Sequence, residues 1–421
     1  MTGAAIALGP QDHTYLHLDT PSRPMHWALL LQLGAGARLD IATVRDRVAE
    51  RAGRYPLFRT GIIGGRWRRP RVVQVGAIDA PAQVGAATYT DDADLHAQVG
   101  ILMGAHLDRG RPFWHLTLFT PAEPMSGAAQ FFLLRVHHSL SDGIAGAAFS
   151  ALLADADDSG LAEFDRFTTS ERFHLSGIDP DELATAKAAF GEIWAAGRAG
   201  RNWPRLRRSG RREAVWHSVS TRDLRRAANR TGASVHEYLL AVVGATLSTA
   251  PPAGTSSSNI RVTLPVTLDN EFRHTGNAVS VALLNLAGDE TAIPPQLASV
   301  RDQLARIERD RPELHLAAAD DAPRAPWPIF RILSGVSMNQ MSPDAHVGIN
   351  PGFTRVRTVL GVPIDDLTAL SPLVGYSFSV TILVLGTRTS FGIVYDGGAL
   401  PGYGERFLTT FAALLAEVPA P

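Results

Sequence analysis

The residues best suited to chemistry lie in one heptapeptide, His137-His138-Ser139-Leu140-Ser141-Asp142-Gly143. A nearly continuous apolar run at 130–136 precedes it and predicts a strand buried on both faces, and a helix of small residues is predicted at about 144–154. A histidine held near neutrality at such a strand end can serve as a general base. Asp142 could fix the loop, Gly143 would allow close approach of the backbone, and the helix N-terminus would favour a developing oxyanion.

Two other interpretations of this motif remain open. The adjacent histidines could be a buried structural pair, or His137, His138 and Asp142 could bind a metal ion. Neighbouring residues on a strand point to opposite faces, so the sequence favours no metal site here. The chain has no Cys, which excludes a Cys nucleophile, Cys-ligated zinc and iron–sulfur clusters. It has a single lysine, Lys187, and no Gly-Lys-Ser/Thr, so a P-loop is excluded as well.

The composition is that of a globular protein with no marked charge. Of 421 residues, 45% are hydrophobic and 19% are charged, and the net charge is −1. No global field would attract nucleic acid, so no nucleic-acid partner is expected. The sequence contains neither a recognisable signal peptide nor an apolar run long enough to span a bilayer. We therefore expect a cytoplasmic protein that can still contact a membrane surface peripherally.

Strand and helix patterns alternate in both halves of the chain, which predicts a two-lobed α/β protein. We divide it into an N-terminal lobe at 1–165, a polar crossover linker at 166–215 and a C-terminal lobe at 216–421. The main predicted strands are 26–33, 112–120, 130–136, 259–266, 278–286 and 378–385. The main predicted helices are 38–51, 221–230, 235–247 and 294–309.

Several segments together resemble one enzyme family. The heptapeptide resembles the HHxxxDG motif of CoA-dependent acyltransferases, a superfamily that includes chloramphenicol acetyltransferase and peptide synthetase condensation domains. Residues 8–26, 106–119, 264–277 and 371–396 resemble, in order, segments of the wax ester synthase/diacylglycerol acyltransferase family. Residues 155–215 have no such counterpart, and the segment 348–353 departs from the family's pattern.

The resemblance implies two similar lobes of the chloramphenicol acetyltransferase type, with the active site in a tunnel between them. It implies transfer of an acyl group from acyl-CoA to an alcohol, with His138 as general base and no bound cofactor. His137 and Asp142 would be mainly architectural, and Asp142 would pair with a distant arginine, for which Arg261 is our candidate. Asn277 matches a family asparagine that could orient His138 or donate to the oxyanion, although it could equally be a turn residue.

Two further functions stay open at this stage. The donor could be an acyl group on a separate carrier protein, as in natural-product biosynthesis, or the chain could be a non-catalytic module that binds a lipid or a partner. Two arginine-rich segments also have two interpretations. The run at 201–212 is either a solvated linker or a lipid contact, and the run at 66–71 is either a charged strand edge or a CoA phosphate site.

Overall fold

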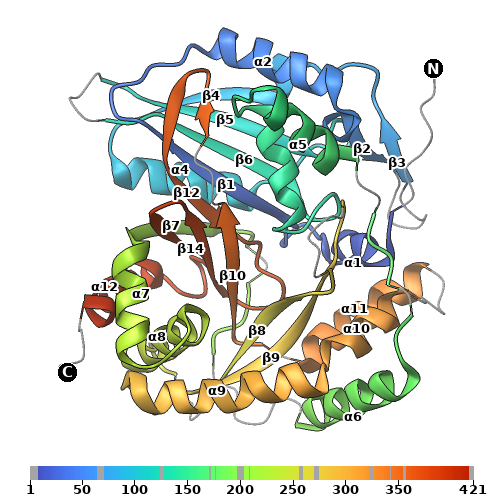
Figure 1. Ribbon diagram of the computed structural model, residues 1–421, viewed down its shortest axis with the longest axis vertical. Coiled ribbons are helices and arrows are strands. Elements are labelled where there is room, and N and C mark those ends of the chain that lie inside the picture. Colours follow the sequence, from blue (N-terminus) through green and yellow to red (C-terminus); the bar gives the residue numbers. More distant parts are fainter. Residues whose placement is uncertain are drawn as a thin grey trace.

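Two six-stranded sheets carry the fold of this computed structural model. It describes residues 8–63, 71–123, 128–169, 172–175, 177–196, 203–207, 209–255, 259–269, 275–321, 327–341, 343–353 and 357–416. One sheet lies in the upper half of the molecule and the other in the lower half (Figure 1). The architecture is two-lobed α/β, as the sequence predicts.

The upper sheet has the strand order β11-β12-β1-β6-β5-β4. Its strands are β1 (His26–Leu33), β4 (Val84–Tyr89), β5 (Trp114–Pro121), β6 (Phe131–His137), β11 (Thr358–Val359) and β12 (Val362–Leu370). Every residue of the central strand β6 is buried, because helices cover one face of the sheet and the lower lobe covers the other. The helices of this lobe are α2 (Ile41–Arg54), η1 (Pro56–Arg59), α3 (Ala80–Gln83), α4 (Asp92–Gly104), η2 (Ala145–Leu152) and α5 (Asp158–Thr169). Beside them, β2 (Thr60–Ile63) and β3 (Arg71–Gln74) form a two-stranded sheet.

The lower sheet has the strand order β7-β14-β13-β10-β8-β9. Its strands are β7 (Arg212–Ser220), β8 (Asn259–Thr267), β9 (Val279–Ala287), β10 (Ala345–Phe353), β13 (Phe378–Leu385) and β14 (Arg388–Asp396). The nearly all-apolar helix α8 (Val235–Thr249) is buried against this sheet. Around it lie α6 (Pro180–Ala196), α7 (Thr221–Arg230), α9 (Ile293–Asp310), α10 (Glu313–Asp321), α11 (Trp327–Met341) and α12 (Tyr403–Ala416).

The structure divides the chain differently from the predicted boundaries at 1–165, 166–215 and 216–421. Strand β12 belongs in sequence to the C-terminal segment, but it pairs antiparallel with β1, with Ala28 opposite Leu370. Strand β7 begins at Arg212, inside the predicted linker, and that linker also contains α6. Strand pairing between distant segments caused the difference, since an alternating apolar pattern does not reveal which sheet a strand joins.

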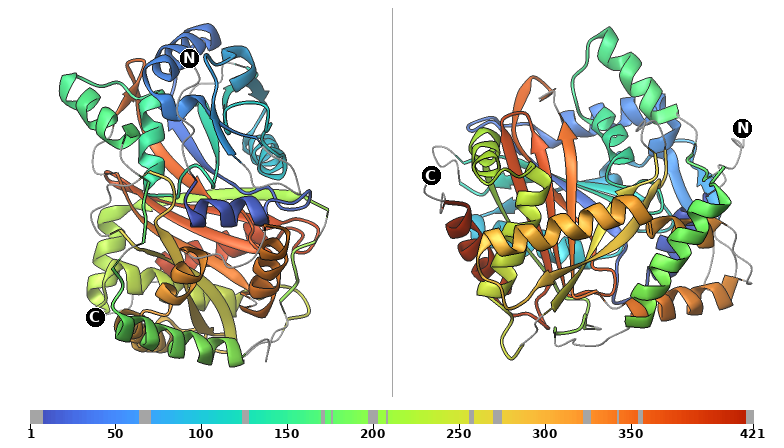
Figure 2. Two further views of the ribbon diagram at one scale, coloured as in Figure 1. Left: turned by 90° about the vertical axis from the view of Figure 1, so that its right-hand side faces the viewer. Right: turned by 60° about the horizontal axis from the view of Figure 1, so that its bottom comes forward.

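A shared apolar cluster joins the two lobes. It contains Met103 of α4, Ala214 of β7, Leu370 of β12 and Val394 of β14. Helix α4 lies directly against β7, because a Cβ on Gly100 would be 2.7 Å from the carbonyl oxygen of Arg212. The short helix α1 (Pro10–Leu18) lies between the two halves of the molecule, beside the loop that follows β6 (Figure 2).

Candidate active site

The heptapeptide forms a tight loop that ties the two lobes together. The backbone N–H of His138 donates to the carbonyl of Met25 at 2.8 Å, which holds the start of the loop against β1. Farther along, Ser141 forms an isolated parallel bridge with Gly276, and the N–H of Asp142 donates to the Gly276 carbonyl at 2.9 Å. The loop after β6 is therefore fixed from both sides before any side chain is considered.

His137 is buried in an ionic pocket of the upper lobe. Its ring stacks on Phe113 with centroids 4.1 Å apart, and its Nε2 lies 3.7 Å from a carboxylate oxygen of Asp19. The backbone N–H of Ser139 donates to Nδ1, so the proton of a neutral ring sits on Nε2 and faces Asp19. Burial lowers the pKa of His137, against the opposing effect of Asp19. Nδ1 is thus engaged by Ser139, while Nε2 faces the Asp19 carboxylate at ion-pair distance.

The carboxylate of Asp19 is the centre of that pocket. Arg109 donates to it at 2.6 Å and His106 lies at 3.1 Å. Burial opposes its ionisation, but hydrogen bonds from His106, His137 and Arg109 hold the pKa of Asp19 well below its usual value. Asp19 is therefore a permanent charge that His137 faces.

His138 points the other way, toward the interface of the lobes. Its ring stacks on Tyr15 of α1 with centroids 3.7 Å apart and planes 8° from parallel. Its Nδ1 lies 3.0 Å from Oδ1 of Asn277. Burial lowers the pKa of His138 to about 4, although Asp142 and Asn277 act in the opposite direction. The ring is therefore neutral at physiological pH.

The partners of Asn277 determine which nitrogen of His138 carries the proton. The Nδ2 group donates to a carboxylate oxygen of Asp12 at 2.7 Å and to the His138 carbonyl at 2.7 Å. A flipped amide would place Oδ1 against these two oxygens, so the amide has one favourable orientation. Its Oδ1 then requires a donor at Nδ1 of His138. In the neutral ring, Nε2 is left as an acceptor.

Asp142 is architectural. One oxygen of its carboxylate accepts from the N–H groups of Ile144 at 2.9 Å and Ala145 at 2.8 Å, and the other accepts from Ala278 at 2.8 Å. It therefore caps η2 and holds the start of β9 at the same time. The predicted helix at 144–154 is a 3-10 helix, and its first N–H groups are taken by Asp142. These two N–H groups are therefore not available to an oxyanion.

Arg261 does not lie beside Asp142, contrary to the prediction. Its guanidinium donates to Asn285 at 3.3 Å and to the Met341 carbonyl at 3.1 Å. Asp142 binds at the opposite end of the β8–β9 hairpin, about 20 Å away for six residues of strand. Strand periodicity placed Arg261 on the correct strand but could not fix its distance from the loop.

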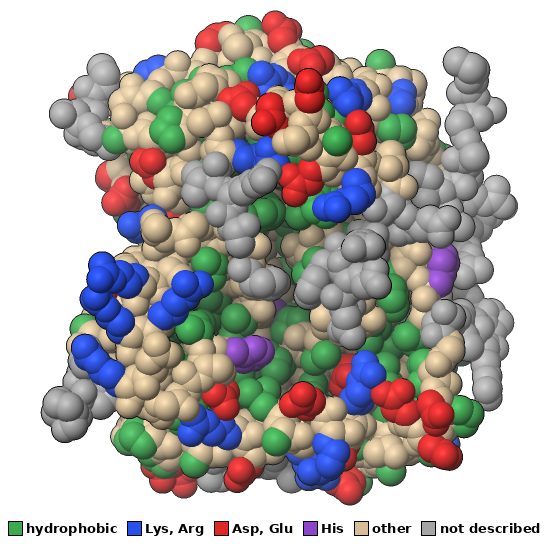
Figure 3. Space-filling model, viewed as in Figure 1, with side chains coloured by type: hydrophobic (Ala, Val, Ile, Leu, Met, Phe, Trp, Pro, Cys, Tyr) green, Lys and Arg blue, Asp and Glu red, His purple; other side chains and the backbone are tan. Residues whose placement is uncertain are grey.

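A cavity of about 480 Å³ lies in front of His138. Both lobes and α11 contribute to its wall, which is mainly apolar, with His138, Asp142 and Gly143 on one side. Among the described residues that line it, none is Lys or Arg. Hydrophobic side chains also gather along the middle of one face of the molecule, between the two halves (Figure 3). The cavity suits an apolar substrate with few polar groups.

A second cavity, of about 890 Å³, adjoins the first. The two share the lining residues Gly143, Ile144, Asn350, Phe353 and Leu383. A Cβ on Gly143 would lie 3.3 Å from Oδ1 of Asn350, so this glycine keeps the backbone close to the boundary between the cavities. The second cavity is lined by two arginines, Arg166 and Arg357.

Comparisons with known proteins agree with this arrangement. Residues 8–176 match the family model described as the wax ester synthase/diacylglycerol acyltransferase catalytic domain. A probable diacylglycerol O-acyltransferase, Tgs1, of Mycobacterium tuberculosis (strain ATCC 25618 / H37Rv) is 24% identical over 378 residues, 77% of this chain and 80% of its own. The N-terminal part of the chain is thus similar to the catalytic domain of the wax ester synthase/diacylglycerol acyltransferase family.

Solved structures show the same fold. A wax ester synthase/diacylglycerol acyltransferase from Marinobacter aquaeolei VT8 matches with a TM-score of 0.70 at 18% identity, covering 98% of each chain. The first condensation domain of the CDA synthetase matches with a TM-score of 0.63 at 17% identity, covering 100% of this chain and 98% of that chain. The fold is thus the two-lobed chloramphenicol acetyltransferase type that the resemblance implied.

The site also contains residues whose roles the sequence patterns did not indicate. Asp12 and Tyr15 lie on α1, where they contact Asn277 and His138, and Asp19 follows the same helix. His346 of β10 lines the first cavity, with its Nδ1 2.9 Å from the Thr263 hydroxyl. Burial lowers the pKa of His346 to about 3, and nearby His138 acts in the same direction. The family resemblance of residues 8–26 pointed to this segment but assigned no role to Asp12, Tyr15 or Asp19.

The arginine-rich segments have structural surroundings where they are described. Arg212 is buried and donates to the Ser22 carbonyl at 2.7 Å, and Trp203 packs in the lower core. Arg212 and Trp203 are therefore part of the protein interior, whereas Arg205, Arg207 and Arg211 of the same run are exposed. Arg201, Arg208 and the residues 66–70 lie outside the described part of the chain, as does the side chain of Arg71. No helix in the described segments is long and apolar enough to cross a membrane.

Proposed function

We propose that this protein transfers an acyl group from a thioester to the hydroxyl of an alcohol, with His138 as general base. The observation that carries the proposal is the contact between Oδ1 of Asn277 and Nδ1 of His138, which leaves Nε2 as a proton acceptor at an apolar cavity. The family model and the named diacylglycerol O-acyltransferase relatives support the reaction class.

The reaction proceeds by direct attack. Nε2 of His138 accepts the proton of the alcohol as its oxygen attacks the thioester carbonyl, and a tetrahedral oxyanion forms. The C–S bond then breaks, and the imidazolium returns its proton to the leaving thiolate. The ester and the free thiol are the products, and no acyl-enzyme is formed. A neutral histidine is needed at the start, which agrees with the lowered pKa of His138.

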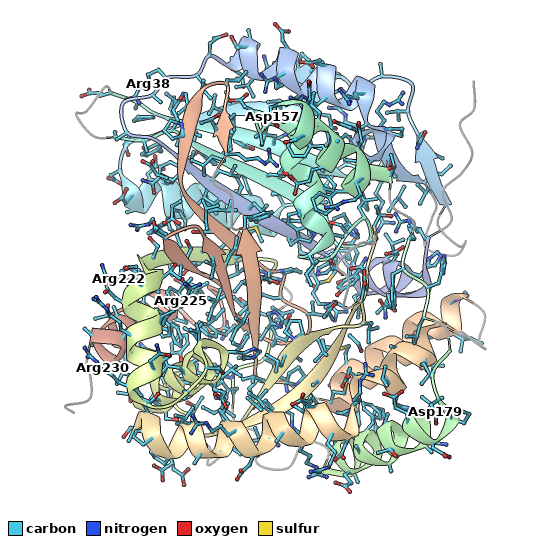
Figure 4. The ribbon with its side chains drawn as sticks, in the orientation of Figure 1. Arg38, Asp157, Asp179, Arg222, Arg225 and Arg230 are labelled. Carbon is cyan, nitrogen blue, oxygen red and sulfur yellow. The ribbon has the colours of Figure 1, made fainter. Side chains whose placement is uncertain are left out.

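The two cavities suggest which substrate occupies which side. The apolar first cavity suits the alcohol and the acyl chain, while Arg166 beside the second cavity suits a donor that carries phosphates. Arg357 also lines the second cavity, where it forms an ion pair with Glu163. The guanidinium of Arg357 lies over Phe164, and that of Arg166 lies over Phe167. Arg222, Arg225 and Arg230 of α7 lie instead on an outer edge of the molecule, away from both cavities (Figure 4). The joined cavities would form the tunnel that the family resemblance implies.

Thiol release tests the reaction. Because the chain has no Cys, a thiol-reactive dye detects only the thiol that the reaction releases. We expect acyl-CoA to release thiol only when a long-chain alcohol or a diacylglycerol is present, and His138→Gln to abolish the signal. Turnover that is unchanged in a folded His138→Gln variant would contradict the proposed base.

Truncated donors test the donor assignment. Arg166→Gln should raise KM for acyl-CoA about tenfold and leave KM for an acyl-N-acetylcysteamine thioester, which lacks phosphates, unchanged.

An acyl-carrier protein is the second candidate donor, since condensation domains share this fold. It is favoured if only carrier-bound thioesters are turned over. Tight acyl binding without turnover of any donor would favour the non-catalytic module.

A peripheral lipid contact is part of the proposal, and α11 is its site. Ile329, Ile332, Leu333 and Val336 recur at helical spacing and are 49–66% exposed. Leu333 also lines the first cavity, so this apolar face is continuous with the cavity that would receive a membrane-soluble alcohol. Ile329→Ser/Ile332→Ser should weaken sedimentation with phosphatidylcholine vesicles without changing turnover of a short soluble alcohol. Equal sedimentation of variant and wild type would contradict this contact.

A further inference from the structure

The crossover segment contributes a charged side chain to the back of the candidate active site. Arg172, which lies between the lobes in sequence, forms an ion pair with Asp12 of α1, and both side chains are buried. The Arg172 backbone also forms a bridge with Thr275, next to the loop that contains Asn277. One ion pair therefore joins the N-terminal helix, the crossover and the loop before β9.

The two carboxylate oxygens of Asp12 accept hydrogen bonds from different donors. Oδ1 accepts from both N–H groups of Asn277, the backbone one at 3.1 Å and the side-chain one at 2.7 Å. Oδ2 accepts from the Gly9 N–H at 2.7 Å and from Arg172. Each oxygen of the carboxylate is thus occupied by two donors. The arrangement holds the Asn277 amide by its donors and turns its Oδ1 toward His138.

Gly276 shows that the backbone is shaped for this pair. Its φ is +80°, and a Cβ there would lie 2.6 Å from Nη1 of Arg172 and 3.1 Å from Oδ1 of Asp12. Any other residue would push the ion pair away from Asn277. The left-handed glycine, the buried arginine and the buried aspartate form one unit with Asn277.

We propose that Arg172 and Asp12 are positioning residues, which act through Asn277 to fix His138 in the tautomer with its proton on Nδ1. This inference rests on the proposed role of His138 as base. Asp12 must be an acceptor toward Asn277 at all times. Burial raises the pKa of Asp12, and the Arg172 charge and the hydrogen bonds from Asn277 and Gly9 offset only part of that rise.

Loss of Arg172 has a definite chemical consequence. A protonated Asp12 carries an O–H donor, so of the two oxygens that oppose a flipped Asn277 amide only the His138 carbonyl remains, and the preference for the present orientation is weakened. The flipped amide presents N–H to Nδ1 of His138, so the ring proton must move to Nε2. A base with its proton on the reacting nitrogen cannot accept the alcohol proton. In serine proteases the wrong histidine tautomer costs about 10⁴ in kcat.

Kinetics of Arg172→Gln give the first test. We expect kcat to fall at least ~100-fold with little change in KM, and Arg172→Lys, which keeps the charge, to restore most of it. The matched control is Arg54→Gln, which removes an exposed arginine from a similar pair with Asp165 at 2.9 Å. That control should keep kcat within twofold. A folded Arg172→Gln variant with kcat within threefold of wild type would overturn the proposal.

Nitrogen-15 NMR of histidine gives a readout that needs no substrate. The ring nitrogen signals of His138 are assigned as those that are absent from the spectrum of His138→Gln. In the wild-type protein these signals should show a neutral ring with its proton on Nδ1 between pH 6 and 8. In Arg172→Gln or Asp12→Asn the proton should move to Nε2. A proton on Nε2 in the wild-type protein overturns the inference even if the variants fail to fold. Conversely, the wild-type protein could show the expected tautomer and transfer no acyl group. That result would contradict the proposed function but would still support the positioning role of Arg172.

Discussion

His137 and His138 are adjacent in the chain, but they lie in two pockets of opposite character. The His137 pocket is ionic, with Asp19, His106 and Arg109 near a ring whose Nδ1 accepts from Ser139 and whose Nε2 faces the Asp19 carboxylate. The His138 pocket is mainly apolar, with an amide on one nitrogen, a cavity beside the ring and the carboxylate of Asp142 near enough to act on its pKa. Identical side chains one residue apart thus have different chemical capacities, because a strand directs neighbouring residues to opposite faces.

The difference between the two pockets indicates which neighbouring groups leave a histidine able to accept a proton. A nearby carboxylate holds a ring and occupies its N–H, as Asp19 does for His137. An amide that accepts from Nδ1 adds no charge, so burial can keep the pKa of His138 low and Nε2 unprotonated. The comparison therefore predicts that the two histidines fail in different ways when they are replaced.

The largest expected effect comes from His138→Gln. It should lower kcat by about 10³-fold or more while the melting temperature changes little, since general acid–base catalysis contributes 10²–10⁴-fold. Acceptor-dependent thiol release and a thermal melt measure the two effects. A comparable rate loss in His137→Gln, with its fold intact, would abolish the distinction between the pockets.

The pH dependence separates the pockets next. The pKa of His138 lies near 4 in the folded protein, below its ordinary 6.5, so activity should be level from pH 6 to 8 and fall as the pH falls toward 4. The same shift makes the unfolded chain bind more protons between pH 6.5 and 4, so stability is lost over that window. Urea midpoints at pH 4.5, 5.5 and 7 should show a smaller loss in His138→Gln than in wild type. An acid limb of kcat/KM near pH 6.5 would contradict the desolvated base.

His137→Gln should act on stability more than on rate. Removing the ring leaves Asp19 with one donor fewer and breaks the stack on Phe113, which should cost about 1–3 kcal/mol of unfolding free energy. We expect kcat to stay within tenfold of wild type below the melting transition. Urea denaturation together with the thiol assay measures both quantities, and an unchanged urea midpoint would show that the ionic pocket does not stabilise the fold.

The smallest effect is expected for Arg261→Gln. Arg261 contacts Asn285 and the Met341 carbonyl, far from the loop after β6, so kcat/KM should stay within twofold of wild type. A large rate loss with a normal melting temperature would restore Arg261 as a functional partner of the loop.

Much of the layout could be predicted from sequence. The apolar run at 130–136 and the motif after it place two histidines at the end of a buried strand, and the alternation of patterns gives a two-lobed α/β fold. The missing pieces are those that depend on distant pairings. The partner strand of β12 and the role of α1 follow from contacts between segments more than 100 residues apart. The distance of Arg261 from the loop follows from the contact of Asp142 with Ala278, which is 136 residues away in the chain.

The sequence by itself determined the residue types that can do chemistry, their order and the local elements that carry them. It determined that His137 and His138 face opposite ways, since that follows from the geometry of one strand. Only the tertiary structure decided which of the two has a free ring nitrogen. That choice depends on Asn277, which lies 139 residues from His138, and on Asp12, which lies 265 residues from Asn277. A hydrogen bond is a property of two positioned groups, and local pattern fixes the position of neither.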